Sequence, residues 1–329
     1  MDVVLVTGGA GYIGSHTSKA VAATGATPVA VDNLHNGHKN FVQWGPLVVA
    51  DILDRDALDA AFEEHRPNSV LHFAGLIDSA ESVANPDKYF RTNVDGTRNL
   101  LECMRQHEVT KMVFSSSAAV YGNNHNTPIR EDARGEPETP YGQSKYNAEA
   151  AIRDLGADFG LQWVSLRYFN AAGASPDSEI GEAHNPETHV IPLAIAAAVN
   201  GKNFRVFGTD YDTPDGTAVR DYVHVDDLAA AHIQAMEYLD QGGTSDAFNL
   251  GGGRGTSVTE ILTEVQIAVG KAVPSVVEPR RPGDAAHLVS DCKRAETNLG
   301  WQTRHSDLEN IVSSAWAWHR GMGSFRSAE

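Results

Sequence analysis

Near its N-terminus the chain reads VVLVTGGAGYIGS over residues 3–15, a run of apolar residues that passes directly into closely spaced glycines. Apolar residues without polar alternation are typical of a strand buried on both faces of a parallel sheet. The glycines would permit a tight turn, close approach of the backbone to a pyrophosphate, and close packing of a helix on the strand. A helix expected over residues 12–24 would direct its free N–H groups at that anion. The segment therefore predicts a dinucleotide-binding turn, with a purely structural turn as the alternative.

A second apolar run, residues 27–31, ends in Asp32. This acid follows the glycines by about 20 residues, the distance at which a carboxylate binds the adenosine ribose hydroxyls of NAD and repels the extra phosphate of NADP. We therefore expect the cofactor to be NAD.

Strand-like and helix-like segments alternate through the first half of the chain. Further strands are expected at residues 47–50, 69–73, 111–114 and 163–168, and helices at 57–65, 87–107 and 141–159. This alternation predicts an α/β fold with a Rossmann-type, doubly wound parallel sheet, in which ligands bind at the carboxyl ends of the strands.

Beyond residue 170 the pattern becomes irregular, except for regular segments at 223–239 and 247–250. We expect a smaller, mixed α/β C-terminal substrate domain made from two separate pieces of chain. The predicted division places residues 1–170 and about 219–250 in the NAD-binding domain, and about 171–218 and 251–329 in the other.

The composition excludes several classes of function. The 43 acidic residues outnumber the 26 lysines and arginines and give a formal charge of -17, which disfavours binding to nucleic acid or anionic membranes. Cys103 and Cys292 form no CxxC pair, no signal peptide is apparent, and no apolar run is long enough to span a bilayer. We expect a cytoplasmic protein. The fourteen histidines show no ligand-like clustering, so we expect no metal site.

Tyr141 and Lys145 are four residues apart on one expected helix face, and Ser117 lies 24 residues upstream at a strand end. Removal of a hydride from a CH–OH group also requires a base for the hydroxyl proton. A nearby ammonium would favour the tyrosine phenolate, although lowering the pKa from about 10 to about 7 takes roughly 4 kcal/mol. A capping tyrosine and a solvated lysine are the structural alternative. These three residues are the predicted catalytic group.

The predicted cofactor-binding residues lie in the glycine-rich turn and the following helix, at strand ends, in the helix at 87–107 and in the catalytic group. Asp51 would accept a hydrogen bond from the adenine amino group, or merely begin a helix. The set is Gly8, Gly11, Tyr12, Ile13, Gly14, Asp32, Asn33, Asp51, Ile52, Phe73, Ala74, Gly75, Asn93, Tyr141, Lys145 and Tyr168.

The motifs TGGAGYIGSH, HFAGL, SSSAAVYG, PYGQSK, RYFNAAGA, VFGTDYDTPDGTAVRDYVHVDDLA and RRPGD resemble the UDP-galactose 4-epimerase family of extended short-chain dehydrogenase/reductases. The resemblance extends over essentially the whole chain. It implies reversible epimerisation of UDP-galactose and UDP-glucose at C4 of the hexose, through a 4-keto sugar and transient NADH. It further implies that Tyr141 takes the proton of the 4-hydroxyl, and that helices 87–107 and 141–159 form a homodimer.

The resemblance also implies that binding energy is concentrated on the UDP, since the hexose must turn over within the site. Arg220 and Arg281 are suited to phosphate oxygens, with a surface salt bridge as the alternative for Arg281. Tyr222 is expected to pack against nucleotide or in the core. The predicted substrate-binding residues are Ser117, Tyr141, Asn170, His189, Arg220, Tyr222, Arg281, Asp284 and Leu288.

Two positions depart from the family pattern. Ile77 stands where the family commonly has a basic residue near the cofactor phosphates, which implies looser NAD retention or compensation elsewhere. Leu288 stands at a hexose-pocket position where a tyrosine would exclude an N-acetyl group. Acceptance of N-acetylated UDP-sugars is therefore open.

Three rival functions compete with this interpretation. A 4,6-dehydratase would need an Asp-Glu pair, whereas this chain has Ser117-Ala118-Ala119. An epimerase of UDP-N-acetylglucosamine/galactosamine or UDP-xylose/arabinose remains an alternative. A non-catalytic NAD-binding regulator would be expected to lose the tyrosine or lysine, and this chain keeps both.

Overall fold

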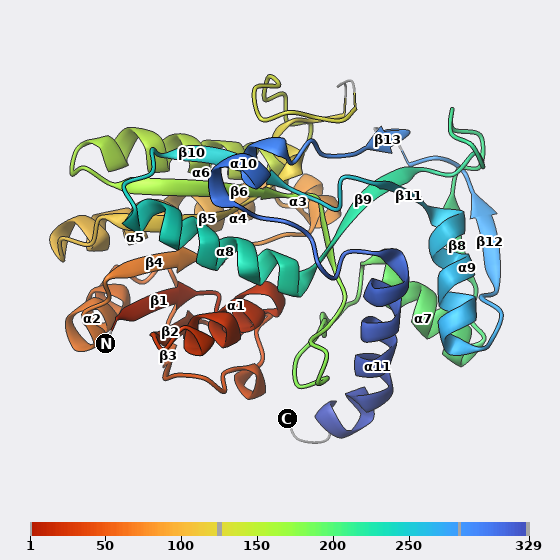
Figure 1. Cartoon of the computed structure of the whole chain (residues 1–329), viewed down its shortest axis with the longest axis horizontal. Coiled ribbons are helices and arrows are strands. Elements are labelled where there is room, and N and C mark those ends of the chain that lie inside the picture. Colours follow the sequence, from red (N-terminus) through yellow and green to blue (C-terminus); the bar gives the residue numbers. More distant parts are fainter. Residues whose placement is uncertain (1, 124–126, 282–283, 327–329) are drawn as a thin grey trace.

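The structure, a computed structural model, describes residues 2–123, 127–281 and 284–326. Figure 1 shows a larger lobe built around one sheet and a smaller lobe that contains the last long helix. Among the described residues, no helix is long and apolar enough to cross a membrane.

The larger lobe contains a seven-stranded sheet in which every pair of neighbouring strands is parallel. Thr7 lies opposite His72, and Ser117 lies opposite Tyr168, so residues distant in sequence share the carboxyl edge of the sheet. The predicted Rossmann-type fold is confirmed. The strands, in their spatial order, are β10 (Asp246–Leu250), β6 (Gln162–Tyr168), β5 (Lys111–Ser117), β4 (Ser69–His72), β1 (Val3–Thr7), β2 (Thr27–Asp32) and β3 (Leu47–Val49).

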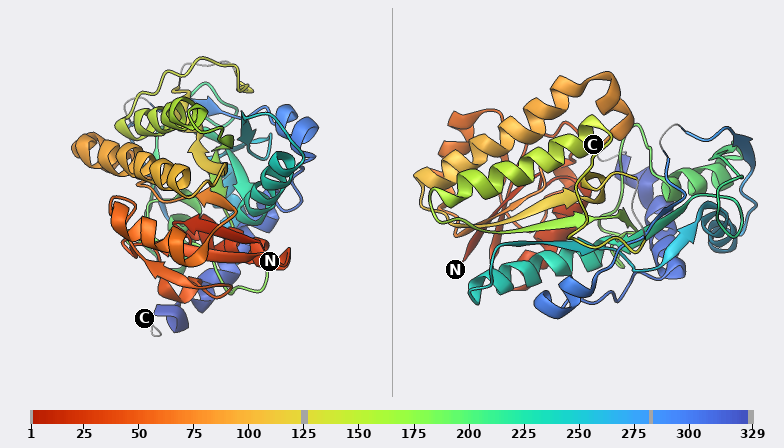
Figure 2. Two further views of the ribbon diagram at one scale, coloured as in Figure 1. Left: turned by 90° about the vertical axis from the view of Figure 1, so that its left-hand side faces the viewer. Right: turned by 90° about the horizontal axis from the view of Figure 1, so that it is seen from above.

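Apolar side chains on both faces of this sheet bury two separate cores. Along β1, Val4 and Val6 enter one core, whereas Leu5 enters the other. Because successive strand side chains point to opposite faces, an uninterrupted apolar run requires helices on both sides. The views in Figure 2 show this arrangement. The helices on one face are α1 (Tyr12–Ala23), α8 (Val225–Asp240) and α10 (Lys293–Leu299); those on the other are α2 (Arg55–His65), α5 (Gly96–Gln106) and α6 (Pro140–Ala157).

The region expected to form a single helix, residues 87–107, consists of three consecutive helical segments of different geometry. A short α-helix, α4 (Pro86–Phe90), passes through a π-helical segment at Arg91–Asp95 into α5. The π segment contains the predicted site residue Asn93. A further helix, α3 (Ser79–Ala84), was not predicted; the Asp78 carboxylate caps it by accepting bonds from Ala80 N (2.8 Å) and Glu81 N (2.9 Å).

The smaller lobe combines three helices with two small sheets. Its core lies between α7 (Val190–Asn200), α9 (Val258–Val269) and α11 (Leu308–Arg326). Pro192 falls within the first turn of α7, where its missing N–H is tolerated. The strands are β8 (Phe204–Phe207) with β12 (Ser275–Glu278), and β7 (Asn170–Ala172), β9 (Val219–His224), β11 (Gly255–Ser257) and β13 (His287–Leu288).

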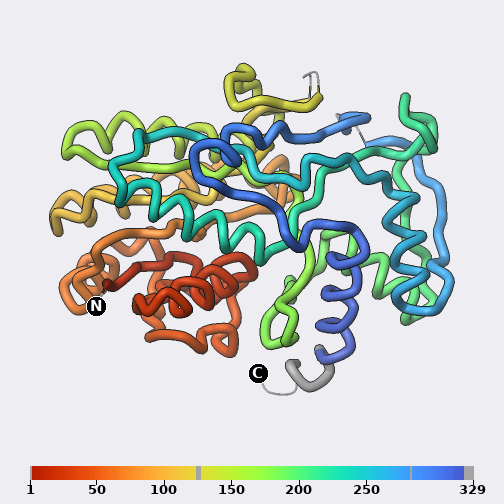
Figure 3. Tube along the Cα trace, in the orientation of Figure 1, coloured from red at the N-terminus to blue at the C-terminus, as the bar shows by residue number. Residues whose placement is uncertain are grey.

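Residues 173–189, here called the strap segment, run from β7 to the start of α7 beside the larger lobe (Figure 3). The Tyr12 hydroxyl donates to the Gly173 carbonyl (2.6 Å), and Lys19 of α1 pairs with Asp177 and with Glu179 (2.8 Å). Three of its own residues, Ala174, Ile180 and Ala183, pack with Phe41 and with Trp318 of α11 in an apolar cluster. The strap segment thus connects the cofactor lobe to α11.

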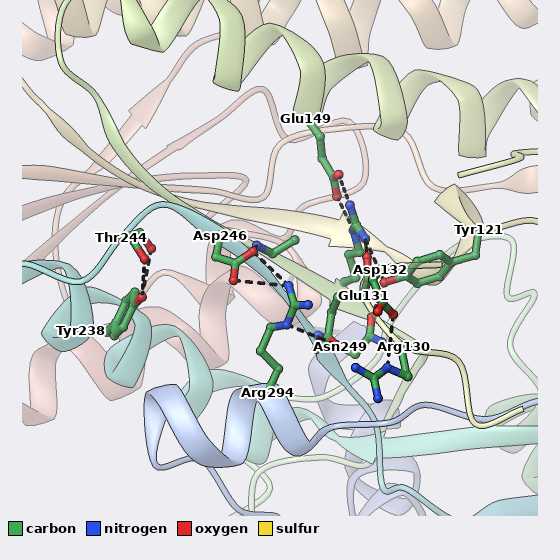
Figure 4. Close-up of polar contacts among 12 residues, drawn as sticks. Tyr121, Arg130, Glu131, Asp132, Glu149, Tyr238, Thr244, Asp246, Asn249 and Arg294 are labelled. Carbon is green, nitrogen blue, oxygen red and sulfur yellow. Dashed lines mark hydrogen bonds and ion pairs between the residues drawn. The ribbon is translucent and has the colours of Figure 1, made fainter. Parts of the chain in front are cut away.

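A polar network links helix α6 to strands β6 and β10 of the large sheet (Figure 4). The Arg167 guanidinium makes two bonds to the Glu149 carboxylate (2.6 and 2.9 Å), and a third to the Tyr121 hydroxyl (2.9 Å). Tyr121 in turn donates to Asn249 of β10 (2.7 Å). The network holds α6, which carries the predicted base, against the edge of the sheet.

Candidate active site

A cleft of about 800 Å³ opens at the carboxyl edge of the large sheet and extends to the smaller lobe. Its size is within the usual range for a ligand pocket. Every predicted site residue except Asn93 lines it. The sequence therefore identified a set of residues that the fold brings together, although their individual roles stay predictions.

The glycine-rich turn leaves room for a pyrophosphate because side chains are excluded from it. Gly8 has φ +72°, in the left-handed region that glycine tolerates. A Cβ on Gly14 would lie 2.1 Å from the Gly8 carbonyl oxygen. Gly11 precedes α1 with no side-chain cap, so the first N–H groups of the helix remain available to an anion. These features fit a bound dinucleotide.

The Asp32 carboxylate lies at the end of β2 on the cleft wall. It accepts bonds from Ala10 N (3.0 Å) and Leu34 N (2.8 Å), one on each oxygen. Burial raises the pKa of this carboxyl. Each oxygen retains a lone pair for a ribose hydroxyl. Nearby, the Asn33 amide donates to Asp51 (2.9 Å), and Asp51 and Ile52 line the same end of the cleft.

Asn93 lies behind the residues that line the cleft, and its expected contact with the cofactor stays a prediction. Its side chain is 2% exposed and exchanges two bonds with the backbone of Leu76 (2.8 and 3.0 Å). A further bond runs from its amide to Ser144 (2.9 Å). Because its amide groups are occupied in this way, Asn93 positions the loop that follows β4, where Phe73, Ala74 and Gly75 line the cleft.

The three predicted catalytic residues all line the cleft. Ser117 ends β5, while Tyr141 and Lys145 lie one turn apart near the start of α6. Thr139 caps that helix by accepting from Gly142 N (3.2 Å). Tyr168, opposite Ser117 in the sheet, contacts His232 through its hydroxyl (2.5 Å) and also lines the cleft.

In the protein without cofactor, the pKa of Tyr141 is shifted away from the value that a general base needs at neutral pH. Burial raises the pKa of Tyr141, and a hydrogen bond with Ser117 only partly opposes this. Burial also lowers the pKa of Lys145 to about 8, and its ammonium donates to the Ser115 carbonyl (2.8 Å). A phenolate at neutral pH therefore needs positive charge beyond that of Lys145.

The substrate side of the cleft contains two arginines in different settings. Arg220 of β9 forms an ion pair with Asp284 and donates to the Ala285 carbonyl (2.8 Å). Some of the N–H donors of its guanidinium group are therefore already engaged. Arg281 is exposed, and its guanidinium lies 3.9 Å from the centre of the Phe207 ring. Between Arg281 and Asp284, the motif RRPGD has two residues, 282 and 283, outside the described residues.

The remaining predicted substrate residues come from β7, β9, β13 and the start of α7. Asn170 lies opposite Tyr222 in the small sheet and donates to the Asp221 carbonyl (2.8 Å). Tyr222 lines the cleft and also belongs to the core of the smaller lobe, so its core role is observed and its contact with nucleotide stays a prediction. Leu288 and His189 line the cleft as well.

The expectation that the histidines do not cluster is wrong for the strap segment. Glu182, His184, Glu187 and His189 bring one ligand atom each to within 4.8 Å of one another. The buried Glu182 carboxylate raises the pKa of His189 to about 10. The spacing ExHxxExH over residues 182–189 could have indicated this cluster of potential metal ligands. It was overlooked because the other histidines are scattered along the chain.

Ile77 is 42% exposed and lines the cleft beside the cofactor-binding turn. The structure thus places an apolar residue where the family pattern has a basic one.

Comparisons with known proteins agree with this geometry. Over residues 4–251 the chain matches the NAD dependent epimerase/dehydratase family. A UDP-glucose 4-epimerase of Rhizobium meliloti (strain 1021) is 48% identical over 317 residues, covering 96% of each protein. The crystal structure of UDP-glucose 4-epimerase from Brucella ovis in complex with NAD matches with a TM-score of 0.94 and 46% identity, covering 96% of this chain and 98% of that one.

The UDP-Glc/GlcNAc 4-epimerase of Campylobacter jejuni matches with a TM-score of 0.85 and 36% identity, covering 97% of this chain and 99% of that one. The identity is high over nearly the full length, and the fold is shared with these epimerases. The glycine-rich turn agrees with the NAD in the name of the family. The chain belongs to the NAD dependent epimerase/dehydratase family, among its UDP-glucose 4-epimerases.

Proposed function

We propose that this protein interconverts UDP-galactose and UDP-glucose by inverting C4 of the hexose. The observation that carries the proposal is that Tyr141 and Ser117 line the same cleft as the glycine-rich turn. Two arginines, Arg220 and Arg281, line this cleft as well. The names of the relatives, UDP-glucose 4-epimerase, support the same substrate.

In the proposed reaction, NAD when bound supplies the acceptor for the C4 hydride and returns it to the opposite face of the sugar. Tyr141 takes the proton of the 4-hydroxyl, and Ser117 holds the same oxygen through its own hydroxyl. The sugar becomes a 4-ketone, and Tyr141 gives the proton back when the hydride returns. Lys145 contributes positive charge near the tyrosine, and a bound oxidised nicotinamide would supply the further positive charge that phenolate formation requires.

The substrate is held by its nucleotide end. We propose that Arg281 and Arg220 bind diphosphate oxygens, with Arg220 partly released from its ion pair with Asp284 as Asp284 turns to the uridine ribose. His189, Asn170 and the ring of Tyr222 complete the pocket. Weak contacts at the hexose leave it free to turn over.

A second substrate class is proposed because of Leu288. This half-buried residue lines the sugar end of the cleft and is smaller than a tyrosine, which leaves space for an N-acetyl group. A structural relative carries the name UDP-Glc/GlcNAc 4-epimerase. Turnover of UDP-N-acetylglucosamine beside UDP-glucose decides this point, and no acetylated turnover would refute it.

We also propose a cytoplasmic location, a homodimer through α5 and α6, and a two-domain division near the predicted one, in which β9 belongs to the smaller lobe and α10 packs on the large sheet. Tyr146 and Leu155 of α6 are large apolar residues on the surface, 40% and 37% exposed, and would be covered in such a dimer. Sedimentation of the purified protein tests the dimer.

The function is tested by incubating purified protein with UDP-galactose, first without any added nucleotide, and assaying UDP-glucose. Conversion without addition supports the function and shows that NAD is retained despite Ile77. Conversion only after NAD is added supports the function with loose retention. Absence of conversion in both cases contradicts the proposal.

A further inference from the structure

The strap segment brings four metal-ligating side chains together over only eight residues. Glu182, His184, Glu187 and His189 lie just before and at the N-cap of α7. No role in the proposed epimerisation requires this combination, because His189 alone was expected to approach the substrate.

The distances among these side chains are close to those of a tetrahedral metal site. His189 Nδ1 lies 2.5 Å from Glu182 Oε1 and 2.9 Å from Glu187 Oε1, and His184 Nδ1 lies 3.1 Å from Glu182 Oε1. Zinc bonds of about 2.0–2.2 Å separate tetrahedral ligands by about 3.3 Å. A central ion therefore requires the closest pair, His189 Nδ1 and Glu182 Oε1, to move apart by about 0.8 Å, while all four ligand atoms already lie within 4.8 Å of one another.

The charge of the cluster also favours a cation. The Glu182 side chain is only 6% exposed. Among the described residues, neither Glu182 nor Glu187 has a lysine or arginine as an ion-pair partner. A divalent ion would replace the proton that His189 Nδ1 shares with the two carboxylates, and would neutralise both of them.

We propose that Glu182, His184, Glu187 and His189 bind one divalent transition-metal ion of the zinc class. Two imidazole nitrogens disfavour magnesium and calcium, which prefer all-oxygen sites. Four protein ligands fill a tetrahedral shell, so the ion is structural and does not enter the reaction.

The ion would fix the strap segment where it meets the rest of the molecule. The Glu182 carbonyl accepts from Trp318 Nε1 of α11 (2.8 Å), and the Ala183 carbonyl contacts His38 Nε2 (3.0 Å). Because His189 turns its Nδ1 toward the cluster, its Nε2 remains for hydrogen bonding in the cleft that it lines.

The test uses the full chain without an affinity tag, stripped with a chelator and dialysed. Zn²⁺ is titrated by calorimetry, Co²⁺ by its visible absorption, and Mg²⁺ serves as the negative probe. We expect one Zn²⁺ per chain, a tetrahedral Co²⁺ spectrum, and a Tm higher by about 4 °C at a free-metal concentration of about 100 times Kd. None of these readouts depends on turnover.

The double variant His184→Gln/Glu187→Gln is expected to lose at least roughly 100-fold in Zn²⁺ affinity. The matched control His65→Gln/Glu64→Gln alters an adjacent His–Glu pair at the end of α2 and should bind as the unaltered chain does. If the double variant does not fold, Glu187→Gln alone, which keeps an acceptor for Thr188 N, must still alter the Co²⁺ spectrum. Absence of stoichiometric Zn²⁺ binding, or equal binding by the folded variant, would overturn the proposal.

Discussion

The two halves of the cleft are built in different ways. On the cofactor side, Ser117, Tyr141 and Lys145 lie on one β-strand and one long helix that pack on a single parallel sheet. On the proposed substrate side, Arg220, Arg281 and Asp284 come from a small sheet and a connecting segment, and an ion pair already engages two of them. The proposed catalytic residues are thus held in place by the fold, whereas the proposed substrate-binding residues would have to rearrange to bind a nucleotide.

The largest effect should come from Tyr141→Phe, which removes the proton acceptor while keeping the ring. We expect kcat to fall by about 10³-fold, within the range for general acid–base catalysis, with KM and Tm nearly unchanged. Tyr146→Phe changes an exposed tyrosine of the same helix and serves as the control. A kcat within threefold of the unaltered enzyme would remove Tyr141 from the chemistry.

The second prediction distinguishes the role of the Arg167–Glu149 pair, which stabilises the packing of α6, from the catalytic role proposed for residues of that helix. Arg167→Met would leave the Glu149 carboxylate, 11% exposed, without its charge partner. Breaking a buried pair costs about 3–5 kcal/mol, so we expect Tm to fall by several degrees while the kcat of the folded fraction changes little. Arg153→Met breaks an exposed pair on the same helix and should cost less than about 1 kcal/mol. Equal losses in the two variants would contradict the assigned role of the network.

The third effect belongs to the substrate half and should appear in KM. Arg281→Ala removes a cation from the cleft and is expected to raise KM for UDP-galactose by roughly 10- to 100-fold with a smaller change in kcat. Its neighbour Arg280 pairs with Asp210 (2.7 Å) and does not line the cleft, so Arg280→Ala is the control. A loss confined to kcat would erase the distinction between the two halves.

The smallest effect is the pH dependence from Lys145, whose pKa burial lowers to about 8. Above that pH the folded protein loses the ammonium, so kcat should decline in the alkaline range, and Lys145→Met should lack this decline. The effect of Lys145 on the free energy of unfolding has the opposite dependence on pH. Between about pH 8 and the unfolded value of about 10.4, the unfolded chain binds the extra proton, so this group raises stability with increasing pH. A flat kcat profile from pH 7 to 10 would contradict this role.

The sequence predicted the cofactor half well because its signals are local. Unbroken apolar strands require cover on both faces, and the glycines around Gly8 leave few alternatives for the turn. The contacts of Asn93 with Leu76 and Ser144 were not predicted, because they depend on the π-helical segment and such packing has no local signature. The raised pKa of Tyr141 depends on burial by distant segments, which spacing does not reveal.

The cluster in the strap segment was missed for a related reason. Its ligands are close in sequence, but their convergence depends on the path between β7 and α7, which Trp318 and His38 help to fix. Irregular segments of this kind have no periodicity from which side-chain directions follow.

The most direct test of the account follows the hydrogen at C4. UDP-galactose carrying deuterium at C4 is converted in ordinary water, and the UDP-glucose product is analysed by mass spectrometry and NMR. Oxidation and reduction within one site, with Tyr141 handling only the hydroxyl proton, predicts that the deuterium remains at C4. Replacement of the deuterium by solvent hydrogen would contradict the account, because C4 would then exchange its hydrogen as a proton.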